Sequence, residues 1–394
     1  MKQWYPSMAP REYRYPDMRS DPQKATIAVF DLGGTWFRWG LYLPSRGLVE
    51  PRREPAISYL SHPHWSAAQL QRGLTDFVIR RTREMQSDHA LPLWGAGVSI
   101  GAPVNAHDRT VLGSGPLWGP SGGRLCLEDL LQEAMPEIHW HVLNDVTALL
   151  APYMVSKDPV RKTLLITVST GVGARLYDHR TRAIPYDGTY GVQGEIGHLT
   201  LTFEFDGQVI NRRCECGGWN HLNAFSSGRG IAHILKSVLT MSPEFWTLFP
   251  GTPQIWERAS DEYRLDAFKQ WLNNGDTLAG RLLDAIATPL SRTLATALSL
   301  DPEIDRIVIT GGVAQGIGKH YREALQRAFL RDGLYQISEH DPQYLTRRLH
   351  WEEPDESGGL RGAGMFAEMN DTRARDQGGF GQGINNEHRT PASN

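Results

Sequence analysis

Two glycine-rich turns that carry hydroxyl groups could bind phosphate. Asp31-Leu-Gly-Gly-Thr35 follows the apolar run 25–30, and Ser169-Thr-Gly-Val-Gly173 follows the apolar run 163–168. Because a second β-rich run follows each turn, both are expected at the tips of β-hairpins. Glycine lets the backbone approach another group closely, and backbone N–H groups with a threonine hydroxyl suit phosphate oxygens. Asp31 could also hold Mg²⁺ through water. An ordinary glycine turn is the alternative at each place.

A polar pair, Asn144-Asp145, ends the apolar run 139–143. An aspartate at the end of a buried strand can accept a hydroxyl proton as a general base, while Asn144 orients a neighbouring hydroxyl. The alternative is capping of a helix that is expected from Val146, since Asn and Asp are favoured N-caps. Taken alone, the pair favours the cap.

Two cysteines and two histidines form a candidate metal site. Cys214-Glu-Cys216 places two thiols one residue apart, with His198 before them and His221 after them. Two thiolates and two imidazoles satisfy the tetrahedral preference of Zn²⁺, and four protein ligands leave no open position for a catalytic water. The sequence therefore predicts a structural zinc. Unreactive buried cysteines with surface histidines are the alternative.

A third glycine turn, Thr310-Gly-Gly-Val313, follows the apolar run 304–309. It is a candidate platform for a nucleotide base. A simple turn between a strand and a helix is the alternative.

Strands and helices alternate along the chain, which is typical of a mixed α/β fold. Helices are expected over residues 65–85, 125–135, 146–154 and 276–300. Two α/β halves that face one another would form a cleft for a ligand. We therefore expect an N-terminal arm over 1–24, a first domain over 25–145, a second domain over 146–370 and a disordered tail over 371–394.

The composition limits the kind of protein and its partners. The 394 residues are 40% hydrophobic and 22% charged, as in ordinary globular proteins. A formal net charge of −3 without a long basic run argues against a nucleic-acid partner. Three cysteines do not make a disulfide framework, so a cytoplasmic setting is expected. No apolar stretch is long enough to span a bilayer, so no membrane partner is expected.

Taken in order, these motifs resemble the ROK family (repressor, open reading frame, kinase) of the actin/hexokinase ATPase superfamily. The resemblance covers about residues 26–366 and depends on the joint occurrence of Asp31-x-Gly-Gly-Thr-x-x-Arg38, Asn144-Asp145, Ser169-Thr-Gly-Val-Gly173, Gly194-Glu-Ile-Gly-His198, Cys214-x-Cys-Gly217 and Thr310-Gly-Gly312. It implies two ribonuclease-H-like domains flanking a nucleotide and sugar cleft. It also implies ATP-dependent phosphorylation of a hydroxyl on a sugar or sugar-like polyol, and it is compatible with a homodimer.

The resemblance assigns a role to each motif. Asp145 would be the catalytic base, and substrate hydroxyls would contact Asn144, Glu195 and His198. His198 would also bind zinc, together with Cys214, Cys216 and His221. The residues that would bind Mg·ATP are Asp31, Gly33, Gly34, Thr35, Arg38, Thr170, Gly171 and Gly173, with Gly311 and Gly312 beside the adenosine.

Several positions depart from the family pattern. In the motif C-x-C-G-x-x-G-C-x-E, His221 replaces the last Cys and Asn223 replaces the Glu. That Glu usually accepts hydrogen bonds from hydroxyls near the anomeric carbon, whereas Asn is neutral and also a donor. Arg175 stands where glycine is usual and would add a cation near the phosphates. The loop 114–118, which is expected to line the sugar site, also differs from the family pattern. With Asn223 in the substrate site, we expect a modified hexose, an amino sugar derivative or a cyclitol without an anomeric centre.

Two other functions fit parts of the pattern. A catalytically inactive protein that binds sugar or nucleotide would explain Asn223 and Arg175, although Asp145, Asp31 and both glycine turns are retained. A sugar-responsive repressor would need a helix-turn-helix domain before the first phosphate motif. Only about thirty residues precede Asp31, and they show no two-helix pattern.

Overall fold

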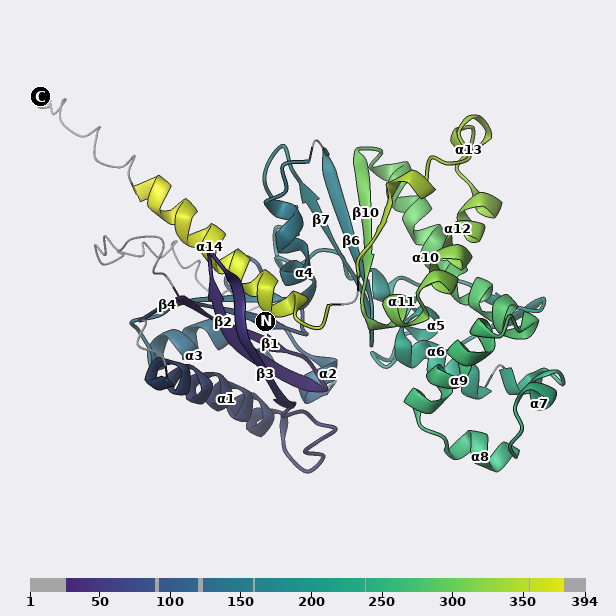
Figure 1. The fold of residues 1–394 in the computed structure, drawn as a ribbon, viewed down its shortest axis with the longest axis horizontal. Coiled ribbons are helices and arrows are strands. Elements are labelled where there is room, and N and C mark those ends of the chain that lie inside the picture. Colours follow the sequence, from purple (N-terminus) through teal and green to yellow (C-terminus); the bar gives the residue numbers. More distant parts are fainter. Residues whose placement is uncertain are drawn as a thin grey trace, which may run out of the picture.

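The fold is organised around two β-sheets that lie side by side (Figure 1). The computed structural model describes residues 26–88, 92–119, 123–158, 160–237, 239–353 and 355–378. The predicted arm over 1–24 therefore lies outside the described residues, as do residues 379–394 of the predicted tail. Within the described ranges, no helix combines the length and the apolar character needed to cross a bilayer.

The first sheet has the strand order β3-β2-β1-β4-β5. Its strands are β1 (Thr26–Leu32), β2 (Trp36–Leu43), β3 (Gly47–Pro55), β4 (Leu93–Ile100) and β5 (His139–Asn144). Strands β1, β4 and β5 run parallel, while β2 and β3 form antiparallel hairpins. Side chains alternate across β1, so Phe30 packs toward α1 (Ala67–Asp88) and Val29 packs toward α14 (Gly358–Gly378). Helix α3 (Leu127–Ala134) contributes Leu127 and Leu131 to the same core as α1.

The second sheet has the order β11-β10-β6-β7. Its strands are β6 (Lys162–Val168), β7 (Val172–Asp178), β10 (Ile304–Thr310) and β11 (Leu349–Trp351). One face packs on α10 (Thr277–Leu300) and α12 (Lys319–Asp332) in the largest core cluster. The remaining elements are α2 (Gly115–Trp118), η2 (Ile196–His198), β8 (Phe203–Phe205), β9 (Gln208–Ile210), α5 (Asn223–Ser226), α6 (Gly228–Ser237), η3 (Leu239–Met241), α7 (Phe245–Leu248), α8 (Pro253–Arg258), α9 (Asp261–Asn273), α11 (Gly312–Ile317), α13 (Ile337–His340) and η4 (Thr346–Arg348).

Helix α4 (Asp145–Met154) connects the two halves and has two buried faces. Ala148 and Ala151 pack against α14, whereas Val146 and Leu150 pack against the second sheet. The helix therefore lies between the sheets, as Figure 1 shows. Because its first residue is Asp145, the candidate base is placed at the junction of the two halves.

The C-terminal helix differs from the predicted division of the chain. Helix α14 lies against β1 and β4 of the first sheet, although residues 358–370 were expected in the second domain (Figure 1). The predicted disordered tail also begins inside this helix. Asp371 is buried, and its Oδ1 lies 3.4 Å from Nε2 of His141 on β5. Leu360, Ala363 and Ala367 recur at helical spacing and supply the apolar face that holds the helix on the sheet.

Candidate active site

The ends of three parallel strands bring the candidate carboxylates together. In the register of the first sheet, Leu32 pairs with Ile100, and Ile100 pairs with Asn144. The carboxyl ends of β1, β4 and β5 therefore meet at one edge, where ligands of open α/β sheets bind. Asp31 in β1 and Asp145 directly after β5 therefore lie at the same edge of the sheet, although they are far apart in the sequence. Their negative charges are close enough to influence each other.

Asp31 is held by two donors and closely approached by a helix. Its Oδ1 accepts a hydrogen bond from Ser99 Oγ at 3.0 Å, and its Oδ2 accepts one from Arg38 Nη1 at 3.4 Å. Burial raises the pKa of Asp31 above its usual value. At Gly359 in α14, a Cβ atom would lie 2.6 Å from the Asp31 carboxylate, so this close approach requires glycine. Ser99 and Gly359 were not identified from the sequence, since both belong to elements remote from Asp31.

Asn144 both caps α4 and fixes the candidate base. Its Oδ1 accepts from the Val146 N–H at 3.0 Å, which is the capping role considered as the alternative. Its Nδ2 donates to Asp145 Oδ1 at 2.8 Å and to the Ala102 carbonyl at 2.9 Å. Both amide hydrogens are thus engaged, so only the carbonyl oxygen of Asn144 could still bind a substrate hydroxyl.

The two carboxylate oxygens of Asp145 differ in their environment. Oδ1 accepts from Asn144 and from the Val146 N–H at 2.9 Å, whereas Oδ2 faces Gly101 after β4. Burial, together with the nearby charge of Asp31, raises the pKa of Asp145 to about 7. A carboxylate with a pKa near neutrality is both charged enough and basic enough to accept a proton from a hydroxyl.

The predicted phosphate and adenosine turns meet at the end of the second sheet. Thr170 is exposed at the tip of the β6–β7 hairpin, as Thr35 is at the tip of the β1–β2 hairpin. Gly311 has φ +100°, and a Cβ there would lie 2.5 Å from the Val168 carbonyl. Glycine at this position therefore lets the turn after β10 pack directly on the turn after β6. Gly312, which follows it, has open space above its Cα.

The segment Gly194-Glu-Ile-Gly-His198 runs along β7 and presents two candidate ligands. The Ala174 N–H donates to the Gly194 carbonyl at 2.9 Å, and Gly194 and Gly197 face carbonyl groups of β7 too closely to allow a Cβ. The two glycines therefore fix the segment on the strand. Glu195 and His198, which both have exposed side chains, extend from it at neighbouring positions.

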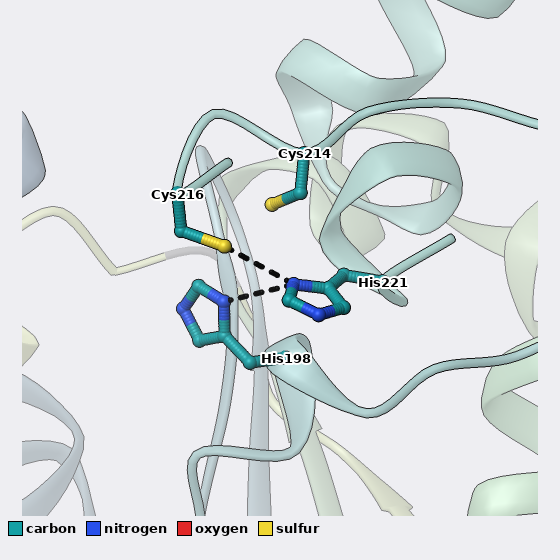
Figure 2. A group of neighbouring side chains, drawn as sticks. All are labelled: His198, Cys214, Cys216 and His221. Atoms are coloured by element: carbon teal, nitrogen blue, oxygen red, sulfur yellow. Dashed lines mark hydrogen bonds between the residues drawn. The ribbon is translucent and has the colours of Figure 1, made fainter. Parts of the chain in front are cut away.

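The four predicted zinc ligands converge (Figure 2). Their ligand atoms all lie within 4.8 Å of one another. The His221 Nδ1 atom lies 3.1 Å from Cys216 Sγ and 3.4 Å from His198 Nδ1. A tetrahedral zinc with bonds of about 2.0–2.3 Å separates its ligand atoms by roughly 3.3–3.8 Å, so this set needs only small adjustments to hold the ion. Burial lowers the pKa of His198, which favours the neutral imidazole that binds metals.

Comparisons with known proteins agree with this arrangement. The profile of the ROK family matches residues 53–368. The 2-epi-5-epi-valiolone 7-kinase of Actinoplanes sp. is 40% identical over 348 residues, which are 88% of this chain and 94% of that protein. The chain belongs to the ROK family.

Further relatives extend the comparison. A C(7)-cyclitol 7-kinase of Streptomyces hygroscopicus subsp. limoneus is 28% identical over 88% of this chain and 95% of its own length. The crystal structure of a ROK family glucokinase from Streptomyces griseus, in complex with glucose and AMPPNP, has a TM-score of 0.62 at 18% identity, covering 88% of this chain and 100% of that chain. The two-domain fold is therefore that of ROK kinases.

Asn223, which replaces the glutamate of the ROK motif, binds the β6–β7 hairpin, whose turn is one of the two candidate phosphate sites (the phosphate hairpin). Its Oδ1 accepts from the Val172 N–H at 2.7 Å, and its amide lies against Gly197. The side chain thus connects the start of α5 to the start of β7, directly after the glycine turn. This hydrogen bond gives Asn223 a structural role in addition to the substrate-binding role expected for it, which stays a prediction.

We expect Asn223→Ala to raise the KM for ATP about fivefold, because it removes one hydrogen bond that fixes the phosphate hairpin. The KM for the acceptor should change little. Glu195→Gln is the matched comparison and should raise the acceptor KM instead. Steady-state kinetics with each substrate varied in turn would test both. If Asn223→Ala raises only the KM for the acceptor, Asn223 binds the acceptor and its contact with the hairpin does not affect ATP binding.

His221, which replaces the last cysteine of the ROK motif, occupies space left by a glycine. A Cβ at Gly218 would lie 2.5 Å from His221 Nε2. An imidazole is larger than a thiol, so Gly218 provides the room that this substitution needs. Gly218 had no predicted role, since the ROK pattern allows any residue there.

Gly218→Ala should therefore weaken zinc binding about 10- to 100-fold by displacing the His221 ring. The double variant Gly218→Ala, His221→Cys should recover the affinity, since a thiol leaves room for the added methyl group. Zinc affinities of the wild type and the three variants, measured by competition with a chelator, form a double-mutant cycle. Additive effects would show that the two positions are independent.

Proposed function

We propose that this protein transfers the γ-phosphoryl group of ATP to the hydroxyl on the seventh carbon of a C7-cyclitol. The observation that carries the reaction type is Asp145, oriented by Asn144 and given a pKa of about 7, between two glycine turns suited to phosphate. The cyclitol class follows from the relatives named as cyclitol 7-kinases, to which the chain is similar over nearly its full length.

In the proposed reaction, the oxygen of the acceptor hydroxyl attacks the γ-phosphorus. Asp145 Oδ2 accepts the proton that this hydroxyl loses. The new O–P bond forms while the bond between the γ-phosphorus and the β,γ-bridging oxygen breaks, and ADP leaves with that oxygen. Asp31, fixed by Ser99 and Arg38, would hold Mg²⁺ through a water molecule. When bound, the ion would neutralise part of the negative charge on the transferring phosphoryl group.

The binding residues divide between the two halves. ATP phosphates would contact Gly33, Gly34, Thr35, Thr170, Gly171 and Gly173, with the adenosine beside Gly311 and Gly312. Acceptor hydroxyls would contact the carbonyl oxygen of Asn144, Glu195 and His198. Asn223 leaves no carboxylate where ROK sugar kinases place one near the anomeric carbon. A carbocycle has no anomeric carbon, so this loss suits a cyclitol.

A structural zinc would be bound by His198, Cys214, Cys216 and His221. The compact set of two thiols and two imidazoles fits the ion. Binding through one ring nitrogen would leave the other nitrogen of His198 for an acceptor hydroxyl and would fix the ring.

ADP release from Mg·ATP tests the proposal when it is measured with 2-epi-5-epi-valiolone, other C7-cyclitols, glucose and N-acetylglucosamine. We expect kcat/KM for a C7-cyclitol to exceed that for glucose by about 100-fold or more, because a site built for one hydroxyl pattern leaves polar groups unpaired with another. A higher kcat/KM for a hexose would contradict the proposal that the acceptor is a cyclitol. ATP binding without turnover of any acceptor would favour an inactive binding protein.

A further inference from the structure

Arg175 is a fully buried arginine that contacts the first turn of α4, the helix that begins with the candidate base. Only 1% of its surface is exposed. It was expected near the phosphates, but period-two alternation along β7 places it on the face that also carries Gly173 and Tyr177 and packs on α4. The guanidinium therefore lies under the helix that begins with Asp145.

The contacts of Arg175 connect three segments of the site. Its Nε donates to Thr147 Oγ1 in α4 at 3.0 Å. Its Nη1 donates to the carbonyls of Ala174, at 2.9 Å, and Gln193. The same nitrogen lies 3.9 Å from Glu195 Oε1. One planar group thus joins β7, the start of α4 and the segment that carries Glu195 and His198.

A buried guanidinium is costly unless negative charge compensates it. The hydrogen-bond partners of Arg175 are neutral, and the side chain of Glu195 is 42% exposed. The charged groups whose charges act on Asp145 are Asp31 from β1, Glu195 from the segment before η2, and Arg175 from β7. Two of these three are negative, so Arg175 is the cation that favours a charged Asp145.

We propose that Arg175 is a positioning residue that favours the ionised form of Asp145 and holds Glu195 at a fixed place relative to it. The inference depends on the proposed function, since it assigns Asp145 the part of base. Arg175 lowers the pKa of Asp145, whereas burial, Asp31 and Glu195 raise it.

The test is the pH dependence of kcat/KM for the cyclitol in Arg175→Gln, Arg175→Lys and the wild type. In the wild type, activity should rise with pH through a midpoint of about 7, as Asp145 loses its proton. Removing the cation raises the pKa of Asp145, so the midpoint of Arg175→Gln should move up by about one pH unit or more. Activity should fall about fivefold near pH 7, approach a tenfold loss below pH 6 and recover toward pH 9.

The conservative variant separates charge from geometry. Arg175→Lys keeps the cation but loses the planar fork, so we expect a midpoint near that of the wild type and a raised KM for the acceptor. The matched control is Arg264→Gln, which removes another buried arginine whose Nη2 donates to Trp256 and Glu257 carbonyls at 2.9 Å. Arg264→Gln should lower thermal stability without moving the midpoint.

The titration of the Asp145 carboxyl can be followed by NMR without any turnover. This measurement distinguishes failure of the inference from failure of the proposed function. With aspartate carboxyls labelled with ¹³C, the NMR signal that disappears in Asp145→Asn identifies Asp145. Its titration midpoint should be higher in Arg175→Gln than in the wild type, whatever the acceptor is. An unchanged midpoint by both NMR and kinetics would overturn the inference, even if the cyclitol is phosphorylated.

Discussion

Asp145→Asn should lower kcat about 10²–10⁴-fold while leaving the KM for ATP nearly unchanged, since it removes only the proton acceptor. The amide can still accept the hydrogen bonds that Asn144 and the Val146 N–H now donate to Oδ1. The geometry at the start of α4 should therefore persist. Initial rates of ADP formation with saturating cyclitol would measure the loss.

The thermal stability of the same variant shows whether the loss is chemical. Burial holds the pKa of Asp145 near 7, well above the ordinary value of 3.8, so ionised Asp145 costs folding free energy at high pH. Removing the charge should raise the melting temperature at pH 8, and the gain should shrink as pH falls toward 5. Near-normal turnover would exclude Asp145 as the base, and a lower melting temperature at pH 8 would show that the fold was damaged.

Loss of the metal should be the second large effect. Cys216→Ser removes a ligand with an exposed side chain, so the substitution itself costs little packing. We expect zinc content to fall from about one ion per chain and the melting temperature to drop by about 10 °C, because metal binding and local folding are coupled. Loss of a fixed His198 should lower kcat/KM about 10- to 100-fold. Elemental analysis and calorimetry on the same samples would measure both.

His221→Cys is the control for this experiment. It restores the ligand usual in the ROK motif and should retain zinc and stability. Wild-type protein that is purified without zinc, and that neither binds added zinc nor gains stability from it, would contradict the metal site.

The convergence of Asp31 and Asp145 could be predicted from the sequence because both follow apolar strands and both belong to motifs of fixed order. The glycine positions were also informative. Gly194, Gly197 and Gly311 each mark a close backbone approach that any other residue would prevent. A glycine marks such an approach in the sequence, although the segment that approaches it lies elsewhere in the chain.

The directions of Arg175 and Asn223 could not be predicted in the same way. Alternation places Arg175 on one face of β7, but only tertiary packing decides that α4 covers that face. Asn223 contacts Val172 across a distance of 51 residues in the chain. The return of α14 to the first sheet is likewise a long-range packing event, driven by the apolar face of a helix that begins with two glycines.

The position of the transferred phosphate tests the central claim most directly. After reaction with Mg·ATP and 2-epi-5-epi-valiolone, a correlation spectrum between ¹H and ³¹P identifies the carbon that carries the phosphate. We predict one new phosphomonoester whose phosphorus couples to the protons on the seventh carbon, outside the ring. Coupling to a ring proton, or release of inorganic phosphate alone, would contradict a cyclitol 7-kinase.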